Sequence, residues 1–226
     1  MKKYFFLSLV FCVSQIFSLS AQSYERRTIK AGETLADNAY YLFPSFTDGV
    51  VKMKDGGKSL SKLNFNMLLC QMQFINEHGD TMNIADPLAI DSIIINGKSF
   101  FYKKGYCEIL YNADSLNLIV SRNVSYEPVK IGAMGLSSHG GSIDSYATIR
   151  DDNNSKQLTI NQDIYVVIES TYFLMNDKAE MLNASKSNFL SLFEKNKEAI
   201  KEYLKSNKTN YNKEADLKRL FVFCTK

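Results

Sequence analysis

The feature that most constrains the fold is a succession of short apolar runs, each closed by a turn signal, between Val50 and Val124. The runs are rich in β-branched and aromatic residues, as β-strands are, and none has the length of an ordinary helix. Asp55-Gly56-Gly57 and Asn96-Gly97 are typical hairpin turns, because these residue types tolerate positive φ. Such regular punctuation predicts an antiparallel meander that forms a barrel or a sandwich. The predicted strands are Val50–Lys54, Leu60–Phe65, Leu68–Ile75, Thr81–Ala85, Ile93–Ile95, Phe100–Tyr102, Tyr106–Tyr111 and Leu116–Val120.

Two further patterns belong to the same β-rich region. Asp86-Pro87 combines an N-cap residue with a proline at the first helical position, so we expect one helical turn over Pro87–Ile90. Ile164–Leu174 has the strongest strand pattern in the chain, because apolar and β-branched residues dominate it. Asn176-Asp177 then predicts a turn into a short partner strand, Ala179–Leu182.

After residue 183 the spacing of the apolar residues changes to that of a helix. Phe, Leu, Ile and Tyr recur three and four residues apart, with Lys and Glu outside this stripe. Ser185 or Ser187 can cap the first helix and Asn212 can cap the last, because their side chains accept hydrogen bonds from a helix N-terminus. The expected fold class is α+β. It has an antiparallel β-rich body over residues 22–183 and a C-terminal unit of two to three helices over residues 184–226.

The first 21 residues have the pattern of a secretory signal peptide. Met1-Lys2-Lys3 is basic, residues 4–19 are mostly apolar, and small residues near Ala21 predict cleavage after Ser20 or after Ala21. The alternative is a transmembrane anchor, but the apolar run is short for a span of about 20 residues and contains Ser and Gln. We therefore expect an exported protein, periplasmic or outer-membrane associated, with no transmembrane segment once the leader is removed.

The charge balance argues against nucleic-acid binding. The formal net charge is +3, and both Lys2 and Lys3 belong to the predicted leader, so the mature chain is close to neutral. A near-neutral surface has no general attraction for phosphate backbones, and we expect no nucleic-acid partner. With 45% hydrophobic and 23% charged residues, the composition is that of a folded globular protein rather than of a disordered chain.

No set of residues is specific for a reaction. His78 lies in a predicted turn, and His139 follows Ser137 and Ser138 within Gly132–Ser145, whose Gly and Ser content predicts a mobile loop. A hydrolase that uses this loop is an alternative. It is disfavoured because a nucleophile and a base that are adjacent in a mobile loop rarely hold a catalytic geometry.

Metal and cofactor sites find no support in the sequence either. Asp151-x-Asn153-x-Ser155 begins like a calcium-binding loop, but Lys156 and Gln162 stand where such a loop needs glycine and a bidentate glutamate. We therefore expect no metal and no cofactor. The 13 Tyr and 15 Phe residues, with no Trp, fit a β-core better than a binding face, although sugar- and protein-binding surfaces use the same residue types.

Cys70, Cys107 and Cys224 remain after removal of the leader. Export would place them where one disulfide can form, and Cys70–Cys107 is the candidate pair because both residues lie in strand-like runs. The favoured interpretation is that all three are small buried apolar residues. Cys224 is either a reactive thiol or a residue that packs beneath the last helix.

Short motifs in a familiar order run along most of the predicted mature chain. They are Tyr41–Gly49, Leu63–Asn66, Met72–Ile75, Gly79–Thr81, Ala85–Pro87, Phe101-Tyr102, Gly105-Tyr106, Phe189–Phe193, Tyr203–Asn207 and Lys213–Leu217. Together they resemble an uncharacterised family of exported cell-envelope proteins from Bacteroidota-type Gram-negative bacteria. The segment Val124–Ile160 matches least well. The resemblance implies an envelope location and a shared fold, and it implies no reaction because the motifs are structural.

Three Asp-Ser/Thr-apolar triplets are similar to the sequon on which such bacteria O-glycosylate periplasmic proteins. Their hydroxyl residues are Thr81, Ser92 and Ser115. We expect modification at one or more of them where the side chain is exposed, because an attached glycan is bulky.

The sequence thus predicts an exported, non-enzymatic envelope protein that acts as a binding or structural accessory module. Its expected partner is an envelope protein or a glycan. The alternatives are a barrel that binds a small ligand or a glycan and, less favoured, a hydrolase whose site is the Gly132–Ser145 loop.

Overall fold

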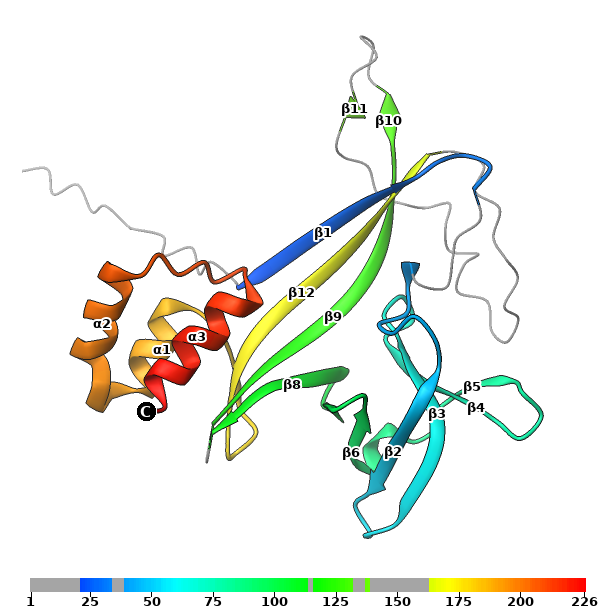
Figure 1. Cartoon of the computed structure of the whole chain (residues 1–226), viewed down its shortest axis with the longest axis horizontal. Helices are drawn as coiled ribbons and strands as arrows, with labels where there is room; N and C mark the ends of the chain where they lie inside the picture. Colours follow the sequence, from blue (N-terminus) through cyan, green and yellow to red (C-terminus); the bar gives the residue numbers. More distant parts are fainter. Residues whose placement is uncertain (1–20, 34–38, 114–115, 132–136, 139–162) are drawn as a thin grey trace, which may run out of the picture.

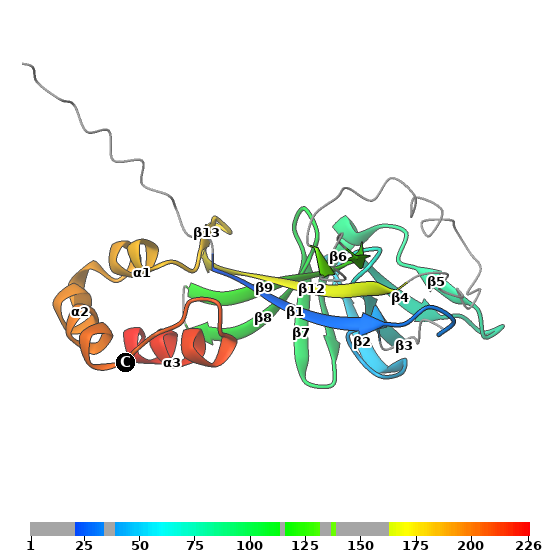
Figure 2. The same ribbon diagram turned by 90° about the horizontal axis from the view of Figure 1, so that it is seen from above.

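The computed structural model describes residues 21–33, 39–113, 116–131, 137–138 and 163–226. Within these residues the chain forms two lobes. Helices make one lobe, most of the shorter strands make the other, and three long strands run between them (Figures 1 and 2). The predicted α+β class, with an antiparallel β-rich body and C-terminal helices, is confirmed. Residues 1–20 of the predicted leader lie outside the described residues, and Ala21 lies within them.

The described strands form one antiparallel sheet of 11 strands and a separate two-stranded pair. Its path is β1-β12-β9-β8-β7-β6-β2-β3-β4-β5, with β13 beside β12. Among the described strands, β1 and β5, which end this path, do not pair with each other. The sheet is therefore a single curled sheet and does not close into a barrel or divide into the two sheets of a sandwich. The strands are β1 (Gln22–Ile29), β2 (Thr47–Met53), β3 (Lys58–Asn66), β4 (Gln71–Ile75), β5 (Thr81–Asn83), β6 (Ile90–Ile95), β7 (Lys98–Tyr102), β8 (Tyr106–Ala113), β9 (Leu116–Pro128), β12 (Ile164–Asn176) and β13 (Met181–Asn183), while β10 (Lys130–Ile131) pairs with β11 (Ser137–Ser138).

Local turn chemistry explains the meander. Asn96 and Gly97 both have positive φ, at 50° and 75°, which gives the tight hairpin between β6 and β7. The Asp86 side chain accepts hydrogen bonds from the backbone N–H groups of Leu88 and Ala89 and so caps a short 3₁₀ helix, η2 (Pro87–Ala89). The predicted turn at this proline is therefore confirmed.

The helical lobe follows β13 directly. Ser185 caps the first helix by accepting a hydrogen bond from the N–H of Asn188, at 3.4 Å. Asn212 does not cap the last helix, whose N-cap is Lys213; its side-chain oxygen accepts a hydrogen bond from Gln22 N–H on β1 instead, at 3.1 Å. None of the helices in the described part of the chain combines the length and the apolar character needed to cross a membrane. The helices are α1 (Lys186–Leu192), η4 (Glu194–Asn196), α2 (Lys197–Ser206) and α3 (Glu214–Cys224).

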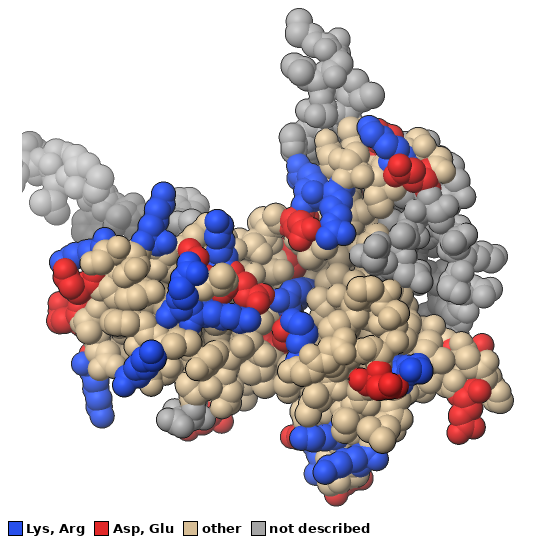
Figure 3. Space-filling view, in the orientation of Figure 1, with Lys and Arg blue, Asp and Glu red and all other residues tan. Residues whose placement is uncertain are grey.

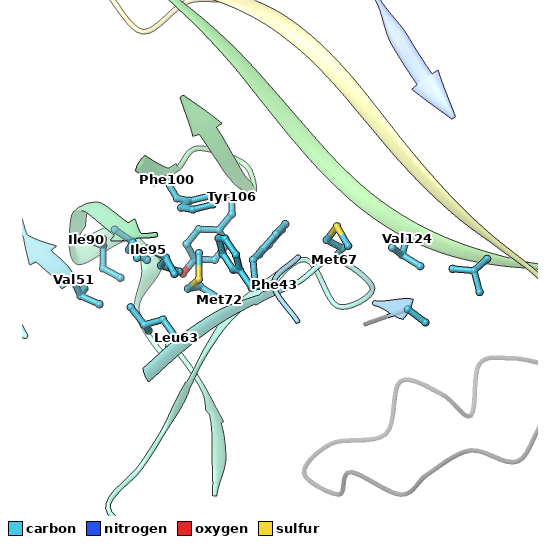
Figure 4. Packing of buried hydrophobic residues seen from close by; sticks show 14 of the residues in the cluster. Phe43, Val51, Leu63, Met67, Met72, Ile90, Ile95, Phe100, Tyr106 and Val124 are labelled. Carbon is cyan, nitrogen blue, oxygen red and sulfur yellow. The ribbon is translucent and has the colours of Figure 1, made fainter. Parts of the chain in front are cut away.

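Two hydrophobic cores occupy opposite ends of the long strands. The β-lobe core contains buried side chains of β2, β3, β4, β6, β7 and β8 and reaches Tyr126 and Val124 on β9. Figure 4 shows Val124 among these side chains. The helical-lobe core contains Leu118 and Val120, from the other end of β9, packed against all three α-helices. Side chains two residues apart on a strand share a face, so both cores lie on the same face of the sheet. Burial of each lobe on this common face holds the molecule together.

Candidate functional site

A polar gap separates the two cores on their shared face. The inward-facing positions of β9 are apolar on both sides of Arg122, and the sheet register places Ser170 of β12 opposite this residue. Ser170 in turn interrupts an apolar series on its own strand. Arg122 and Ser170 therefore lie on the shared face between the two hydrophobic cores. The apolar inward-facing residues are Leu118, Val120, Val124 and Tyr126 on β9, and Ile164, Val166, Ile168, Tyr172 and Leu174 on β12.

Arg122 connects the sheet to the last helix through its guanidinium group. This group contacts the carboxylate of Glu108 on β8 and, at 2.7 Å, that of Glu214 in the first turn of α3. Lys98 is the second partner of Glu108, at 2.5 Å, and Lys218 is the second partner of Glu214, at 3.0 Å. The result is an ion-pair chain of alternating sign, Lys98–Glu108–Arg122–Glu214–Lys218. The side chains of Glu108 and Arg122 are only 4% and 13% exposed, so each charge depends on its partners for stabilisation.

Glu214 links this ion-pair chain to the helix. Partial burial acts to raise the pKa of its carboxyl group, but the hydrogen bond from Lys218 and the positive charges of Arg122, Lys218 and Lys98 outweigh burial and lower the pKa. The carboxylate is therefore ionised at neutral pH. Its place in the first turn of α3 also lets it interact favourably with the positive end of the helix dipole.

β1 adds a row of polar side chains beside the gap. Ser23, Glu25 and Arg27 alternate along this strand, and Ser23 is paired in register with Ser170. Arg27 donates hydrogen bonds from Nε and Nη2 to Glu25 Oε1, at 3.1 and 2.8 Å, and Ser23 Oγ lies 3.4 Å from the hydroxyl of Tyr172. The side chains of Glu25 and Arg27 remain 61% and 55% exposed, so this pair is open to a ligand.

The opposite wall comes from the segment that precedes β2. The backbone N–H of Leu42 donates to Phe65 O at 3.0 Å, and that of Met67 donates to Tyr40 O at 2.8 Å. Tyr41 OH donates to Gln73 Oε1 at 2.7 Å, which fixes the direction of its ring. The wall is thus hydrogen-bonded to β3 and β4 and is set in place before any ligand arrives.

The buried Asn64 holds the same segment from beneath. Its side-chain oxygen accepts the N–H of Phe43 at 3.1 Å, and its amide nitrogen donates to Phe43 O at 2.9 Å. Asn66, two residues later, donates to Gln73 at 3.2 Å. The motifs at Tyr41–Gly49, Leu63–Asn66 and Met72–Ile75, which lie apart in the sequence, therefore meet at one wall of the gap.

These walls line an open cleft of about 330 Å³. β1 and β12 supply three lining residues each, Tyr41, Leu42 and Met67 form one wall, and Arg122 and Glu214 come from the ion-pair chain. Figure 3 shows basic and acidic side chains interspersed where the lobes meet. The volume is at the lower end of the range for small-molecule sites. Because two carboxylates and two guanidinium groups line the cleft, it suits a polar ligand without a large net charge.

The described residues offer few groups for catalysis. In this part of the chain, no group of three or more His, Cys, Asp or Glu residues could hold a metal ion. His78 is exposed in the turn between β4 and β5, away from the cleft. His139 and most of the Gly132–Ser145 segment lie outside the described residues, as does the calcium-like Asp151–Ser155 segment, so the hydrolase alternative stays a prediction.

Two of the three predicted glycosylation positions are described. Thr81 is exposed on β5, at an edge of the sheet. Ser92 is half-buried on β6 and donates a hydrogen bond to Asp91 Oδ2 at 3.1 Å, whereas Ser115 lies outside the described residues. Thr81 is therefore the more accessible of the two described positions.

The predicted disulfide between Cys70 and Cys107 is absent, and this prediction is wrong. Cys70 is exposed in the turn between β3 and β4, at a φ of 53°, and its Sγ donates to Met67 O at 3.5 Å. Cys107 is buried in β8, and β7, β6 and β2 separate that strand from β3 in the sheet. Cys224 is the last residue of α3 and packs as an apolar residue in the helical-lobe core; burial raises its pKa to about 12, which disfavours the reactive thiolate.

Sequence reasoning did not find the cleft. The available signal was the alternation of β9, which continues through Arg122 to Tyr126, beyond the predicted strand end at Val120. A charged residue on the apolar side of a long strand indicates a change of environment, but its partners Glu108 and Glu214 are distant in the sequence. Only the folded chain brings these three residues together.

Comparisons with protein-family models, curated proteins and solved structures find no match to this chain. The resemblance to exported envelope proteins therefore stays a prediction. The function has to follow from the geometry of the cleft.

Proposed function

We propose that the protein is an exported, non-enzymatic binding module of the cell envelope and that the cleft between its lobes is the binding site. One observation carries this proposal. The sheet face that supports both cores becomes polar between them, at Arg122 and Ser170, and the walls there leave a cleft of about 330 Å³. Small-molecule ligands typically bind in clefts of this kind, where a few polar groups converge.

A purely structural role accounts for only part of the cleft. Arg122 stabilises the docking of α3, because it joins Glu108 of the sheet to Glu214 of the helix. Glu25 and Arg27 serve no such purpose, since their ion pair lies within β1 and is largely exposed. Exposed pairs of this kind contribute little to stability. Their place beside Arg122 is better explained by contact with a partner.

Recovery of partners from envelopes tests the proposal. The mature chain with a C-terminal tag is mixed with gently solubilised envelopes and compared with a double variant, Glu25→Arg with Arg27→Glu. This exchange keeps an ion pair on β1 but reverses the order of the charges offered to a partner. The matched control exchanges the exposed pair of β2 and β3, Asp48→Lys with Lys62→Asp. We expect a stoichiometric partner with the wild type and the control but not with the cleft variant; equal recovery with all three would refute the cleft as the site.

A glycan is the second candidate for the ligand, and the hydroxyl groups of the cleft favour it. Ser23, Tyr41, Ser170 and Tyr172 all line the cleft, and hydroxyls donate and accept hydrogen bonds as a sugar requires. Titration with neutral oligosaccharides, followed by tyrosine fluorescence, tests this candidate. Saturable binding that Ser23→Ala weakens would favour a glycan, and no change in the signal would leave the protein partner as the proposal.

A further inference from the structure

We infer that the leader is removed at the Ser20–Ala21 bond and that the mature protein begins at Ala21. The sequence pattern alone allows cleavage on either side of Ala21. This inference shares the prediction of export with the proposed function, but it does not depend on what the cleft binds. It rests on the position of Ala21 in the folded chain.

Ala21 belongs to the fold rather than to the leader. Its side chain is fully buried in the helical-lobe core, with 0% of its surface exposed. Its carbonyl oxygen accepts the backbone N–H of Tyr172 at 2.9 Å. The next residue, Gln22, is also held, because its N–H donates to the side chain of Asn212 before the last helix.

The hydrogen bond from Tyr172 to Ala21 lies at the point of β12 between its pairing with β1 and its pairing with β13. β1 and β13 pair with the same edge of β12. The pairing with β1 ends at Thr171, and the pairing with β13 covers Phe173 and the residues after it. Tyr172 lies between these partners: its N–H donates to Ala21 O, and its carbonyl oxygen accepts the N–H of Ala184. Ala21 thus fills the junction between two strands that pair with the same edge. Cleavage after Ala21 would remove this acceptor from a buried backbone donor.

The leader sequence points to the same bond. Signal peptidases prefer small residues at the last and third-last positions of the leader. Cleavage after Ser20 places Ser18 and Ser20 there, whereas cleavage after Ala21 places the large Leu19 at the third-last position. In the step, a signal-peptidase-type endopeptidase adds one water across the peptide bond. Ser20 leaves with a carboxylate, and Ala21 keeps the amine, which becomes an α-ammonium group.

The order of events follows from the same contacts. In the folded chain Ala21 is buried and its carbonyl group is hydrogen-bonded to β12, so a protease cannot bind this residue in its own active site. β1 pairs only with β12 among the described strands, and that pairing joins residues far apart in the sequence. Cleavage therefore precedes the docking of β1 onto β12. Removal of the leader and completion of the sheet are successive steps.

The mass of the exported protein tests the inference. The full chain, with a tag after the exposed Lys226, is expressed in a Gram-negative host and purified from its envelope, and its intact mass and N-terminal peptide are determined. The expected mature chain begins Ala21-Gln22. A chain that begins at Gln22, with or without cyclisation of that glutamine, would overturn the inference, and so would retention of the leader. None of these outcomes depends on a bound partner.

A second measurement tests the structural reason directly. Three chains are prepared by cleavage from a fusion partner, beginning at Ser20, Ala21 or Gln22. We expect the first two chains to be more stable than the third, whose unfolding equilibrium constant should be about tenfold larger than that of the chain beginning at Ala21, because a buried donor loses its acceptor and the core loses a methyl group. Equal stability of all three chains would show that Ala21 is dispensable and would contradict the argument.

Discussion

Replacement of Arg122 by methionine is the strongest test of how the lobes are joined. The substitution keeps an unbranched, largely apolar side chain and removes the guanidinium that contacts Glu108 and Glu214. Removing one member of a buried ion pair costs about 3 to 5 kcal/mol, because an uncompensated charge stays behind. Glu108 is 4% exposed but keeps Lys98 as a partner, so we expect a loss near the lower limit, about 3 kcal/mol of unfolding free energy.

Chemical denaturation measures this loss. The chain has no tryptophan, so unfolding in urea is followed by circular dichroism and tyrosine fluorescence. The matched control is Arg26→Met, because Arg26 on β1 pairs with Glu127 on β9 at 3.1 Å while both side chains are well exposed. Exposed pairs are worth little, and the control should lose less than about 1 kcal/mol.

A double variant separates the loss of the buried charge from loss of packing. If the cost of Arg122→Met arises from the unpaired Glu108 carboxylate, Glu108→Gln in the same chain should recover at least about 1 kcal/mol of it. A loss below about 1 kcal/mol for Arg122→Met alone would refute the reasoning. So would losses from the two single variants that simply add in the double variant.

Five positions give smaller predictions. Tyr106→Phe should leave the unfolding free energy unchanged or raise it by about 1 kcal/mol in urea titrations, because the buried hydroxyl contacts no hydrogen-bond partner among the described residues. Gly49→Ala should lower it by about 2 kcal/mol, since the added Cβ would lie 2.8 Å from a backbone oxygen of β6. Maleimide at neutral pH should label Cys107 and Cys224 only after unfolding, as peptide mapping would show, because burial raises their pKa values to about 11 and about 12. The lowered pKa of Glu214 means that its ionised form stabilises the fold above its ordinary pKa of 4.5, and that this contribution is lost as pH falls through the lower folded value; Glu214→Gln should flatten that part of an acid titration of stability.

Opposite results would contradict these predictions in different ways. A loss of stability in Tyr106→Phe would mean that the hydroxyl has a partner in solution. An unchanged midpoint for Gly49→Ala would show that β2 and β6 can separate locally without cost. Labelling of Cys224 in the native state would show that the last turn of α3 opens locally and exposes the thiol. If stability falls with decreasing pH to the same extent in the wild type and in Glu214→Gln, Glu214 is not the cause of that fall.

The meander could be predicted because its signals are local. Asn96-Gly97 determines a hairpin and Asp86-Pro87 a capped turn whatever lies elsewhere in the chain. β1 escaped prediction because Tyr24, Glu25, Arg26 and Arg27 give it no apolar alternation; it is a strand through pairing with β12. Asn212 likewise has the residue type of a cap, but β1 uses its side-chain oxygen as an acceptor. Local preference gives way where tertiary pairing is stronger.

The cleft could not be predicted for a related reason. Arg122 appears in the sequence as one charged residue in a polar stretch, and Glu214 as an acidic residue at a helix start. Their meeting depends on the sheet order, which places β8 beside β9, and on α3 packing on the same face. The prediction of a Cys70–Cys107 disulfide was wrong because the local sequence around each cysteine does not show how many strands separate the two residues in the sheet.

Cross-linking from within the cleft tests the central claim most directly. A photoreactive phenylalanine analogue is introduced in place of Arg27, at the cleft, and separately in place of Lys62, on the exposed face of the β2–β3 hairpin. After irradiation of intact cells, the account predicts a discrete adduct from position 27 that is absent from position 62. Adducts from neither position, or the same adduct from both, would contradict the assignment of the cleft as the binding site.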